Sequence, residues 1–277
     1  MAQPLKLLLC LAWLWLPALR ADGEILLLQG SLSSQEQSLL DRGLGWMEEF
    51  FTSQGLPVQP RVQVRVFERY EEFRDFQRVD RARVPNHQLS PSGYYSTRHK
   101  VLVLWRSRRF LQIFLHESQH ALLRSAFPNP PKWINEGLSE CFEGISLDEE
   151  SLVVEPQGPR LRKLKRHLSP DLGEQILEVL WMGDRSFVEQ ANDRGLDSYT
   201  RGWALVFFLW SQPEGPQRLG ELLRGLQSGQ RAVDLLEQQH PGGLSQLKED
   251  LLQFYTSLEL PAQSRERVSG GAAESRP

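Results

Sequence analysis

The chain has 277 residues, of which 40% are hydrophobic, 9% aromatic and 24% charged. These fractions are typical of a globular protein and exclude a disordered chain, a collagen-like repeat and a polytopic membrane protein. The 32 Lys and Arg residues against 35 Asp and Glu residues give a formal charge of −3. A chain with this balance has no bulk positive field for nucleic acid, so we expect no nucleic-acid partner.

The first 21 residues are typical of a secretory signal peptide. Lys6 precedes an apolar run at residues 7–16, and Ala18 and Ala21 are the small residues that suit a signal peptidase. The run is shorter than the roughly 20 apolar residues that span a bilayer, which favours cleavage over an uncleaved N-terminal anchor. We therefore expect an exported protein, periplasmic or secreted, without a membrane span after signal removal. Of the two cysteines, only Cys141 then remains, and we interpret it as a small buried hydrophobe.

Hydrophobic periodicity predicts an α+β fold. The spacing predicts helices over residues 34–51 and 70–79, and alternation predicts a strand over 62–66. A polar loop at 80–92 leads to two strands, 93–95 and 101–105, that form a hairpin, and then to a long buried helix over 107–124. Prolines at 128, 130 and 131 stop that helix, a new one begins near Lys132, and the chain is helical by pattern to Leu258. We expect one domain over 22–258, with an α/β half to about residue 130 and a helical half after it, and a disordered tail over 259–277.

The predicted buried helix contains the sequence His116-Glu117-Ser118-Gln119-His120. Residues four apart lie on one helical face, so the two imidazoles can bind one Zn²⁺. Glu117 projects beside them and can act as general base on a metal-bound water. Two histidines and a carboxylate on so apolar a helix need partners or neutralisation, and a metal ion supplies both.

A third metal ligand is expected shortly after the proline-rich turn. Glu136, in the segment Trp133-Ile134-Asn135-Glu136-Gly137, lies on the second helix, which the turn brings back against the first one. Its carboxylate completes a His₂Glu site, which leaves a fourth position open as in catalytic zinc sites. Glu140 and Glu143 follow on the same helical face, and we expect them to accept hydrogen bonds from the ligand histidines, with a slight preference for Glu140.

These two segments resemble the gluzincin superfamily of zinc metallopeptidases. The closest likeness is to the peptidase-MA-like domains of exported bacterial proteins, many of them of unknown function. The resemblance extends loosely from about Val62 to Leu258, but only the two zinc segments are specific. It implies a zincin-like fold, with a small mixed N-terminal sheet, a central metal-binding helix and a mainly helical C-terminal half. It also implies that His116, His120 and Glu136 bind one zinc and that Glu117 is the base.

Peptide hydrolysis also needs a group that stabilises the developing oxyanion. Tyr199 is our first candidate, because Trp203, Val206, Phe207 and Trp210 share its helical face and would turn it inward; Tyr94 and Tyr95 are weaker alternatives. By analogy with zincins, residues 101–105 would be the edge strand that pairs with extended substrate. We interpret His87, His99, His167 and His240 as surface residues.

The leading hypothesis is a zinc-dependent hydrolase, most simply a monomeric metallopeptidase acting on peptides or proteins. The alternative is an exported binding or scaffold protein that retains a catalytically silent zinc site. A non-haem iron site is compatible with the ligand types, although the spacing of the histidines within one helix favours zinc.

Overall fold

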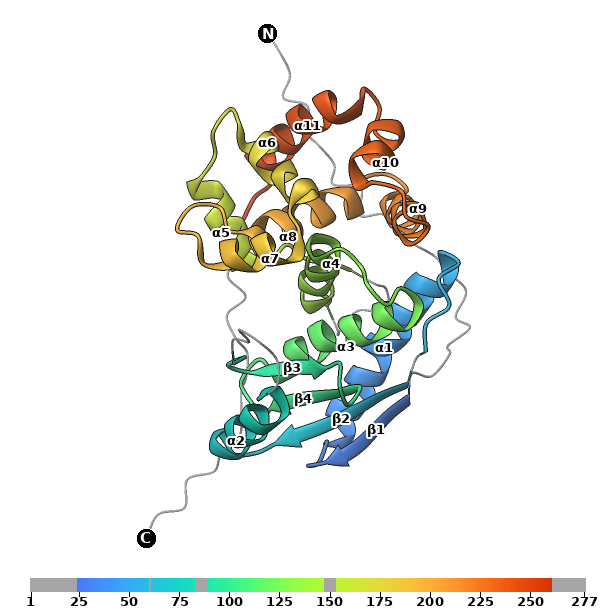
Figure 1. The fold of residues 1–277 in the computed structure, drawn as a ribbon, viewed down its shortest axis with the longest axis vertical. Coiled ribbons are helices and arrows are strands. Elements are labelled where there is room, and N and C mark those ends of the chain that lie inside the picture. Colours follow the sequence, from blue (N-terminus) through green and yellow to red (C-terminus); the bar gives the residue numbers. More distant parts are fainter. Residues whose placement is uncertain (1–23, 60, 83–88, 147–152, 261–277) are drawn as a thin grey trace.

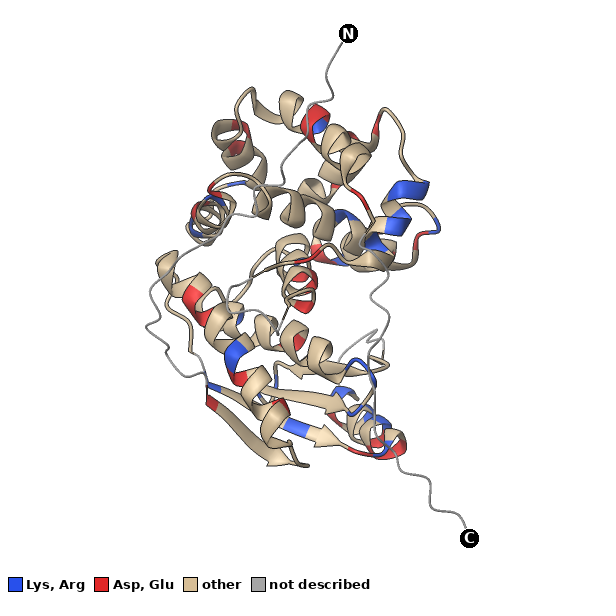
Figure 2. Ribbon diagram, turned by 180° about the vertical axis from the view of Figure 1, so that it is seen from behind, with Lys and Arg blue, Asp and Glu red and all other residues tan. Residues whose placement is uncertain are grey.

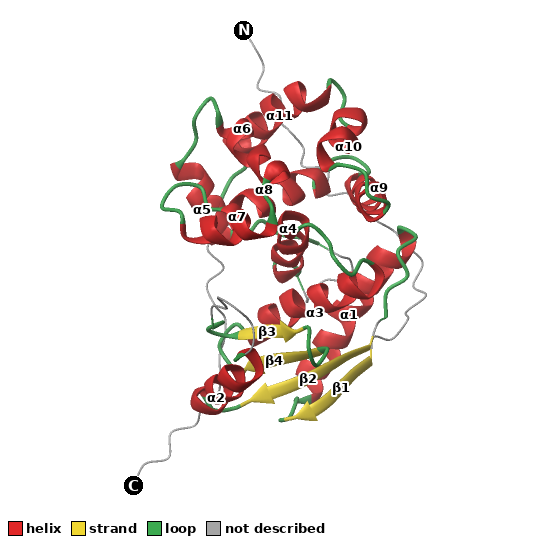
Figure 3. Ribbon diagram, viewed as in Figure 1, coloured by secondary structure: helices red, strands yellow, loops and turns green. Residues whose placement is uncertain are grey.

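The computed structural model describes residues 24–59, 61–82, 89–146 and 153–260 of the chain. The predicted signal peptide lies outside the described residues, as do His87 and residues 261–277 of the predicted tail. Within the described part, a small sheet and its helices occupy the N-terminal half and helices alone form the rest (Figures 1 and 3). The fold is α+β, as the periodicity predicts.

The strands are β1 (Glu24–Gln29), β2 (Arg61–Phe67), β3 (Gly93–Ser96) and β4 (Val101–Trp105). The helices are α1 (Ser34–Ser53), α2 (Tyr70–Arg81), α3 (Phe110–Ala126), α4 (Lys132–Glu143), α5 (Gly158–Arg166), α6 (Leu172–Leu177), α7 (Asp184–Glu189), α8 (Ser198–Trp210), α9 (Gly215–Gln227), α10 (Ala232–Gln239) and α11 (Gly243–Ser257). Two short 3₁₀ helices, η1 (Glu178–Trp181) and η2 (Gln190–Asn192), flank α7. None of the described helices is both long and apolar enough to cross a bilayer.

The four strands form one mixed sheet in the order β1-β2-β4-β3. β1, β2 and β4 are parallel, and β3 runs antiparallel to β4, so the predicted hairpin is confirmed. The prediction that residues 101–105 form the edge strand is wrong, because β4 is paired on both sides and β3 is the edge. Strand β1 was not predicted: its central residues are all apolar, so the alternation that marks a half-buried strand is missing.

The two faces of the sheet pack against different helices. Val62, Val64 and Val66 alternate into the main core, on the side covered by α1 and α3. On the other face, Phe73 of α2 packs against a small cluster made of Phe67, Tyr94, Val101 and Val103. Val79, the last residue of the predicted helical pattern, is 75% exposed, because the buried face of α2 is formed by Phe73, Gln77 and Asp80 and Val79 lies off that face.

Helices α3 and α4 lie between the sheet and the C-terminal helices (Figure 1). Every residue of α4 from Trp133 to Glu143 is buried, since α3 covers one side of the helix and α8 the other. Two glycines allow α4 and α8 to approach closely: a Cβ built on Gly137 would lie 2.6 Å from the carbonyl oxygen of Gly202. Polar residues of α4 are therefore held deep in the molecule, where they need partners.

Candidate metal centre

His116 and His120 on α3 and Glu136 on α4 come together as three possible metal ligands, with their ligand atoms all within 4.8 Å of one another. Glu136 Oε2 lies 3.8 Å from His116 Nε2 and 3.6 Å from His120 Nε2. A tetrahedral zinc ion bound at about 2.0–2.1 Å separates its ligand atoms by roughly 3.4 Å. The arrangement thus fits a small divalent cation after shifts of a few tenths of an ångström.

Local sequence explains how Glu136 reaches the histidines. α3 ends at Ala126, and Pro128, Pro130 and Pro131 prevent its continuation. Pro131 then occupies the N-cap position of α4, where its missing N–H costs nothing. Glu136 stands in the second turn of α4 and is only 6% exposed.

The two histidines are oriented by different neighbours. His116 Nδ1 lies 3.0 Å from a carboxylate oxygen of Glu143, whose other oxygen accepts from Arg109. The slight preference for Glu140 as the partner of a ligand histidine does not match this geometry. Glu140 lies within the same 4.8 Å group as His116 and Glu143, but its carboxylate accepts from Arg160, with Arg160 Nε at 2.8 Å.

His120 is oriented by a hydroxyl that the sequence reasoning missed. Ser139 Oγ is fully buried and lies 3.0 Å from His120 Nδ1, and it also contacts Gln119 Oε1 and the carbonyl oxygen of Asn135. A hydroxyl has one proton to donate. If Ser139 donates it to one of these two oxygens, it accepts the proton of His120 Nδ1, which leaves Nε2 free to bind a cation.

The third ligand has an outer partner too. Lys132 Nζ donates to Glu136 Oε1 at 3.3 Å, whereas Oε2 faces the histidines. Lys132 lies one turn before Glu136 on α4, so the spacing was visible in the sequence; its contact with a ligand was not. Each of the three possible ligands is therefore held by a separate group, as is usual around protein metal sites.

The buried charges of the cluster favour an additional positive charge. Burial lowers the pKa of His116, but the hydrogen bond to Glu143 and the charges of Glu117 and Glu143 outweigh it and raise the pKa to about 10. Burial lowers the pKa of His120 to about 4, so this imidazole is neutral at pH 7, as a metal ligand must be. Burial raises the pKa of Glu136, but its interactions with the His120 imidazole and the Lys132 ammonium bring it below its usual value. The raised pKa of His116 shows that the surrounding carboxylates favour a positive charge at this position, and a bound divalent cation would supply that charge.

Glu117 points toward the free edge of the sheet. Its Oε2 accepts a hydrogen bond of 2.7 Å from the backbone N–H of Tyr95 on β3. Burial and the charge of Glu136 raise the pKa of Glu117 to about 6, although the charge of His116 and the Tyr95 hydrogen bond lower it. A carboxyl group with a pKa near neutrality is suited to accepting and returning a proton.

A cavity of about 570 Å³ adjoins His116 and Glu117, between the sheet half and the helical half. Tyr199 lines this cavity from the first turn of α8, and burial together with the charges of Glu136 and Glu140 raises its pKa above the usual value. Tyr94, the weaker alternative, belongs to the cluster under α2 on the opposite face of the sheet. Tyr95 reaches the site through its backbone N–H.

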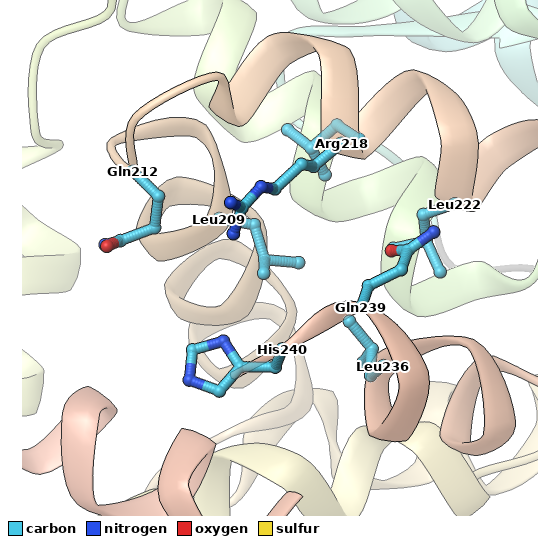
Figure 4. Close-up of a pocket in the computed structure, with 8 residues that line it drawn as sticks. Leu209, Gln212, Arg218, Leu222, Leu236, Gln239 and His240 are labelled. Atoms are coloured by element: carbon cyan, nitrogen blue, oxygen red, sulfur yellow. The ribbon is translucent and has the colours of Figure 1, made fainter. Parts of the chain in front are cut away.

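The remaining predicted positions lie away from this centre. Cys141 is buried in the core, as predicted. His99 is exposed, with 50% of its side chain accessible. His240 was predicted at the surface, but its side chain is 9% exposed and its Nε2 lies 2.8 Å from Asp250 Oδ2. His240 borders a second cavity of about 20 Å³, room for about one water molecule, beside Leu209, Gln212 and Leu236 (Figure 4).

Comparison with known proteins gives a family without an assigned activity. Residues 114–228 match a family described as "Protein of unknown function (DUF1570)". The matched span begins two residues before His116 and includes Glu136, the cavity-lining residues of α5 and the whole of α8. No curated protein matches the chain. The likeness therefore covers the possible metal site and leaves its chemistry to be argued from the residues.

Proposed function

We propose that this protein is a zinc-dependent hydrolase, most simply a metallopeptidase. The observation that carries the proposal is the position of Glu117, next to a ligand histidine and at the wall of a cavity large enough for part of a substrate. A purely structural metal site is usually closed by four protein ligands and needs no base. Three ligands with an adjacent buried carboxylate favour hydrolysis.

His116, His120 and Glu136 would hold the zinc ion, which when bound polarises a substrate carbonyl and lowers the pKa of a coordinated water. Glu117 would take a proton from the attacking water and deliver it to the leaving amine. Its position beside His116, held by the hydrogen bond from the Tyr95 N–H, suits this exchange. Tyr199, whose hydroxyl is protonated at neutral pH, would donate a hydrogen bond to the developing oxyanion.

The edge strand β3 is the proposed platform for extended substrate. The carbonyl of Ser92 accepts from the N–H of Trp105 on β4, and pairing alternates along an antiparallel ladder. The backbone groups of Gly93 and Tyr95 consequently face away from β4, on the side where Glu117 lies. A peptide that adds to this edge would pass beside Glu117. Export of the mature chain, based on residues 1–21, is part of the same proposal.

The test compares the metal content and hydrolysis of four proteins: wild type, His116→Ala, Glu136→Ala and Glu117→Gln. We expect about one zinc per chain by elemental mass spectrometry in wild type and Glu117→Gln, and loss of zinc in the other two. Glu117→Gln should lower turnover of a fluorogenic peptide library at least about 100-fold. Glu249→Gln, which changes an exposed carboxylate on α11, is the matched control.

Two results would contradict the proposal. Full activity in Glu117→Gln would remove the assigned base. Zinc at one ion per chain without hydrolysis of any peptide by the wild type would favour the alternative, a binding or scaffold protein with a silent zinc site.

A further inference from the structure

The cavity beside His116 and Glu117 is lined mostly by polar and charged residues, and the arrangement of their charges indicates what enters it. Its apolar lining residues are Pro91, Ile113 and Pro159. The charged side chains that line it, apart from His116 and Glu117, are Arg109, Glu140, Glu143, Arg160, Lys163 and Asp197. A charged group that enters the cavity would meet oppositely charged partners among these side chains.

The acids of the cavity are buried behind its cations. The side chains of Glu140, Glu143 and Asp197 are each 7% exposed. The cations bound to them are more accessible: the exposed fraction is 62% for Arg109, 23% for Lys163 and 22% for Arg160. Although the formal charges nearly balance, a group entering the cavity meets positive charge first.

Buried acids also fix the direction of these cations. Lys163 Nζ lies 2.6 Å from Asp197 Oδ2, and Arg160 binds both oxygens of Glu140. Arg109 contacts Glu143 through Nη2, and its guanidinium has no second side-chain partner among the residues that the structure describes. Its remaining N–H groups can therefore bind an incoming carboxylate, a charge-assisted contact that arginine makes well.

The two chain segments that supply the cations of the cavity contain basic residues but no acidic ones. Residues 81–116 contain no Asp or Glu, and neither do residues 156–170. The first segment supplies Arg109 and the second supplies Arg160 and Lys163. Exposed Arg108 and Arg162 flank these lining residues in the sequence, and Figure 2 shows the concentration of basic residues on α5.

We propose that this cavity binds a carboxylate of the substrate, so that the protein acts on acidic peptides. The inference rests on the proposed hydrolase function and assigns its substrate class. A basic side chain would meet Arg109 and Lys163 before it reached Glu140, Glu143 or Asp197, and these three acids are already paired with cations. An acidic side chain would form hydrogen-bonded ion pairs with these cations, which a neutral side chain cannot form.

Binding is measured on zinc-loaded, full-length Glu117→Gln protein, so that hydrolysis is not needed for the result. The probes are fluorescein-labelled, C-terminally amidated peptides Ala-Ala-Gly-X-Ala-Ala, with X as Glu, Gln or Lys. By fluorescence anisotropy we expect the Glu peptide to bind at least about 10-fold more tightly than the Gln peptide, and the Lys peptide to bind most weakly. The preference should shrink at high salt, because the cations are partly exposed. The Gln peptide with a free C-terminal carboxylate tests whether a chain end replaces an acidic side chain.

Variants connect the preference to the cavity. Arg109→Gln and Lys163→Gln should each reduce the preference for Glu over Gln at least about 3-fold, consistent with loss of one charged contact. Arg166→Gln removes the same charge from the exposed side of α5 and should leave the preference unchanged. Since Lys163 also pairs with the cap of α8, exposed Arg109 provides the variant least able to disturb folding.

Equal binding of the three amidated peptides, tighter binding of the Lys peptide, or a preference that survives in both cavity variants would overturn the proposal. Failure of the proposed function looks different. If wild-type protein binds the Glu peptide selectively but hydrolyses none of the peptides, the carboxylate site stands and the peptidase assignment does not.

Discussion

A methyl group added at Gly137 should disturb the metal centre indirectly, by forcing α4 away from α8. Gly137 follows the ligand Glu136 on α4 and faces α8. A Cβ built there lies 2.6 Å from both the carbonyl oxygen of Gly202 and Cγ2 of Val206. Ordinary contact begins at 3.4 Å, so Gly137→Ala is about 0.8 Å too close to the backbone of α8. Backbone atoms cannot rotate aside, so the two helices must separate.

The expected cost follows from two opposing effects. Overpacking of a close-packed interior costs about 1–3 kcal/mol. In a helix interior, alanine is more stable than glycine by about 1 kcal/mol, and this gain offsets part of the overpacking cost. The free energy of unfolding should therefore fall by about 1 kcal/mol, or about 2–4 °C in Tm for a chain of this size. Separation of α4 from α8 would also push Glu136 out of its position relative to the two histidines, so zinc affinity should fall by about 10-fold or more.

The assay combines chemical denaturation with zinc affinity from competition against a chromogenic chelator. Gly195→Ala is the control, because its added Cβ finds no atom closer than 3.6 Å. It should keep wild-type zinc affinity and stability. If Gly137→Ala also kept wild-type zinc affinity and stability, the close approach of α4 and α8 would not set the position of Glu136, which would refute the link between this contact and the metal centre.

Three further predictions concern the groups around the site. Lys132→Met should weaken zinc binding about 10-fold, because Glu136 loses the donor to Oε1. Lys132→Arg should restore part of the affinity. Tighter binding in Lys132→Met would mean that repulsion between the lysine and the zinc ion outweighs the orienting effect of the lysine on Glu136. Ser139→Ala should weaken zinc binding by a similar factor, since His120 Nδ1 loses its partner, and an unchanged dissociation constant would contradict that role. Asp197→Asn should lower the free energy of unfolding at pH 7 by about 1–2 kcal/mol, because the α8 cap and the Lys163 pair are weakened. Burial raises the pKa of Asp197, but Lys163 and Thr200 bring it below its usual value. The stability it contributes is thus present above about pH 4 and is lost as pH falls through the folded-state pKa, so urea denaturation should show the two proteins converging in acid.

Local patterns were enough for most elements. The helices around His116 and Glu136 are each marked by a strong hydrophobic pattern and by proline punctuation, and both form as predicted. β1 escaped prediction because an all-apolar run has no period that separates strand from helix. The edge position of β3 was also missed, since strand order depends on contacts between segments far apart in the chain.

The sequence by itself determined which residues could bind a metal, because the i, i+4 spacing places His116 and His120 on one helical face wherever that helix lies. It also indicated Glu136 through the short proline-rich return between two helices. Only the tertiary structure decided which neighbours orient those ligands. Glu143 and Glu140 share one helical face, yet Glu143 meets His116 and Glu140 meets Arg160. That choice depends on where the fold places Arg160 of α5, and the spacing of residues within α4 carries no information about α5.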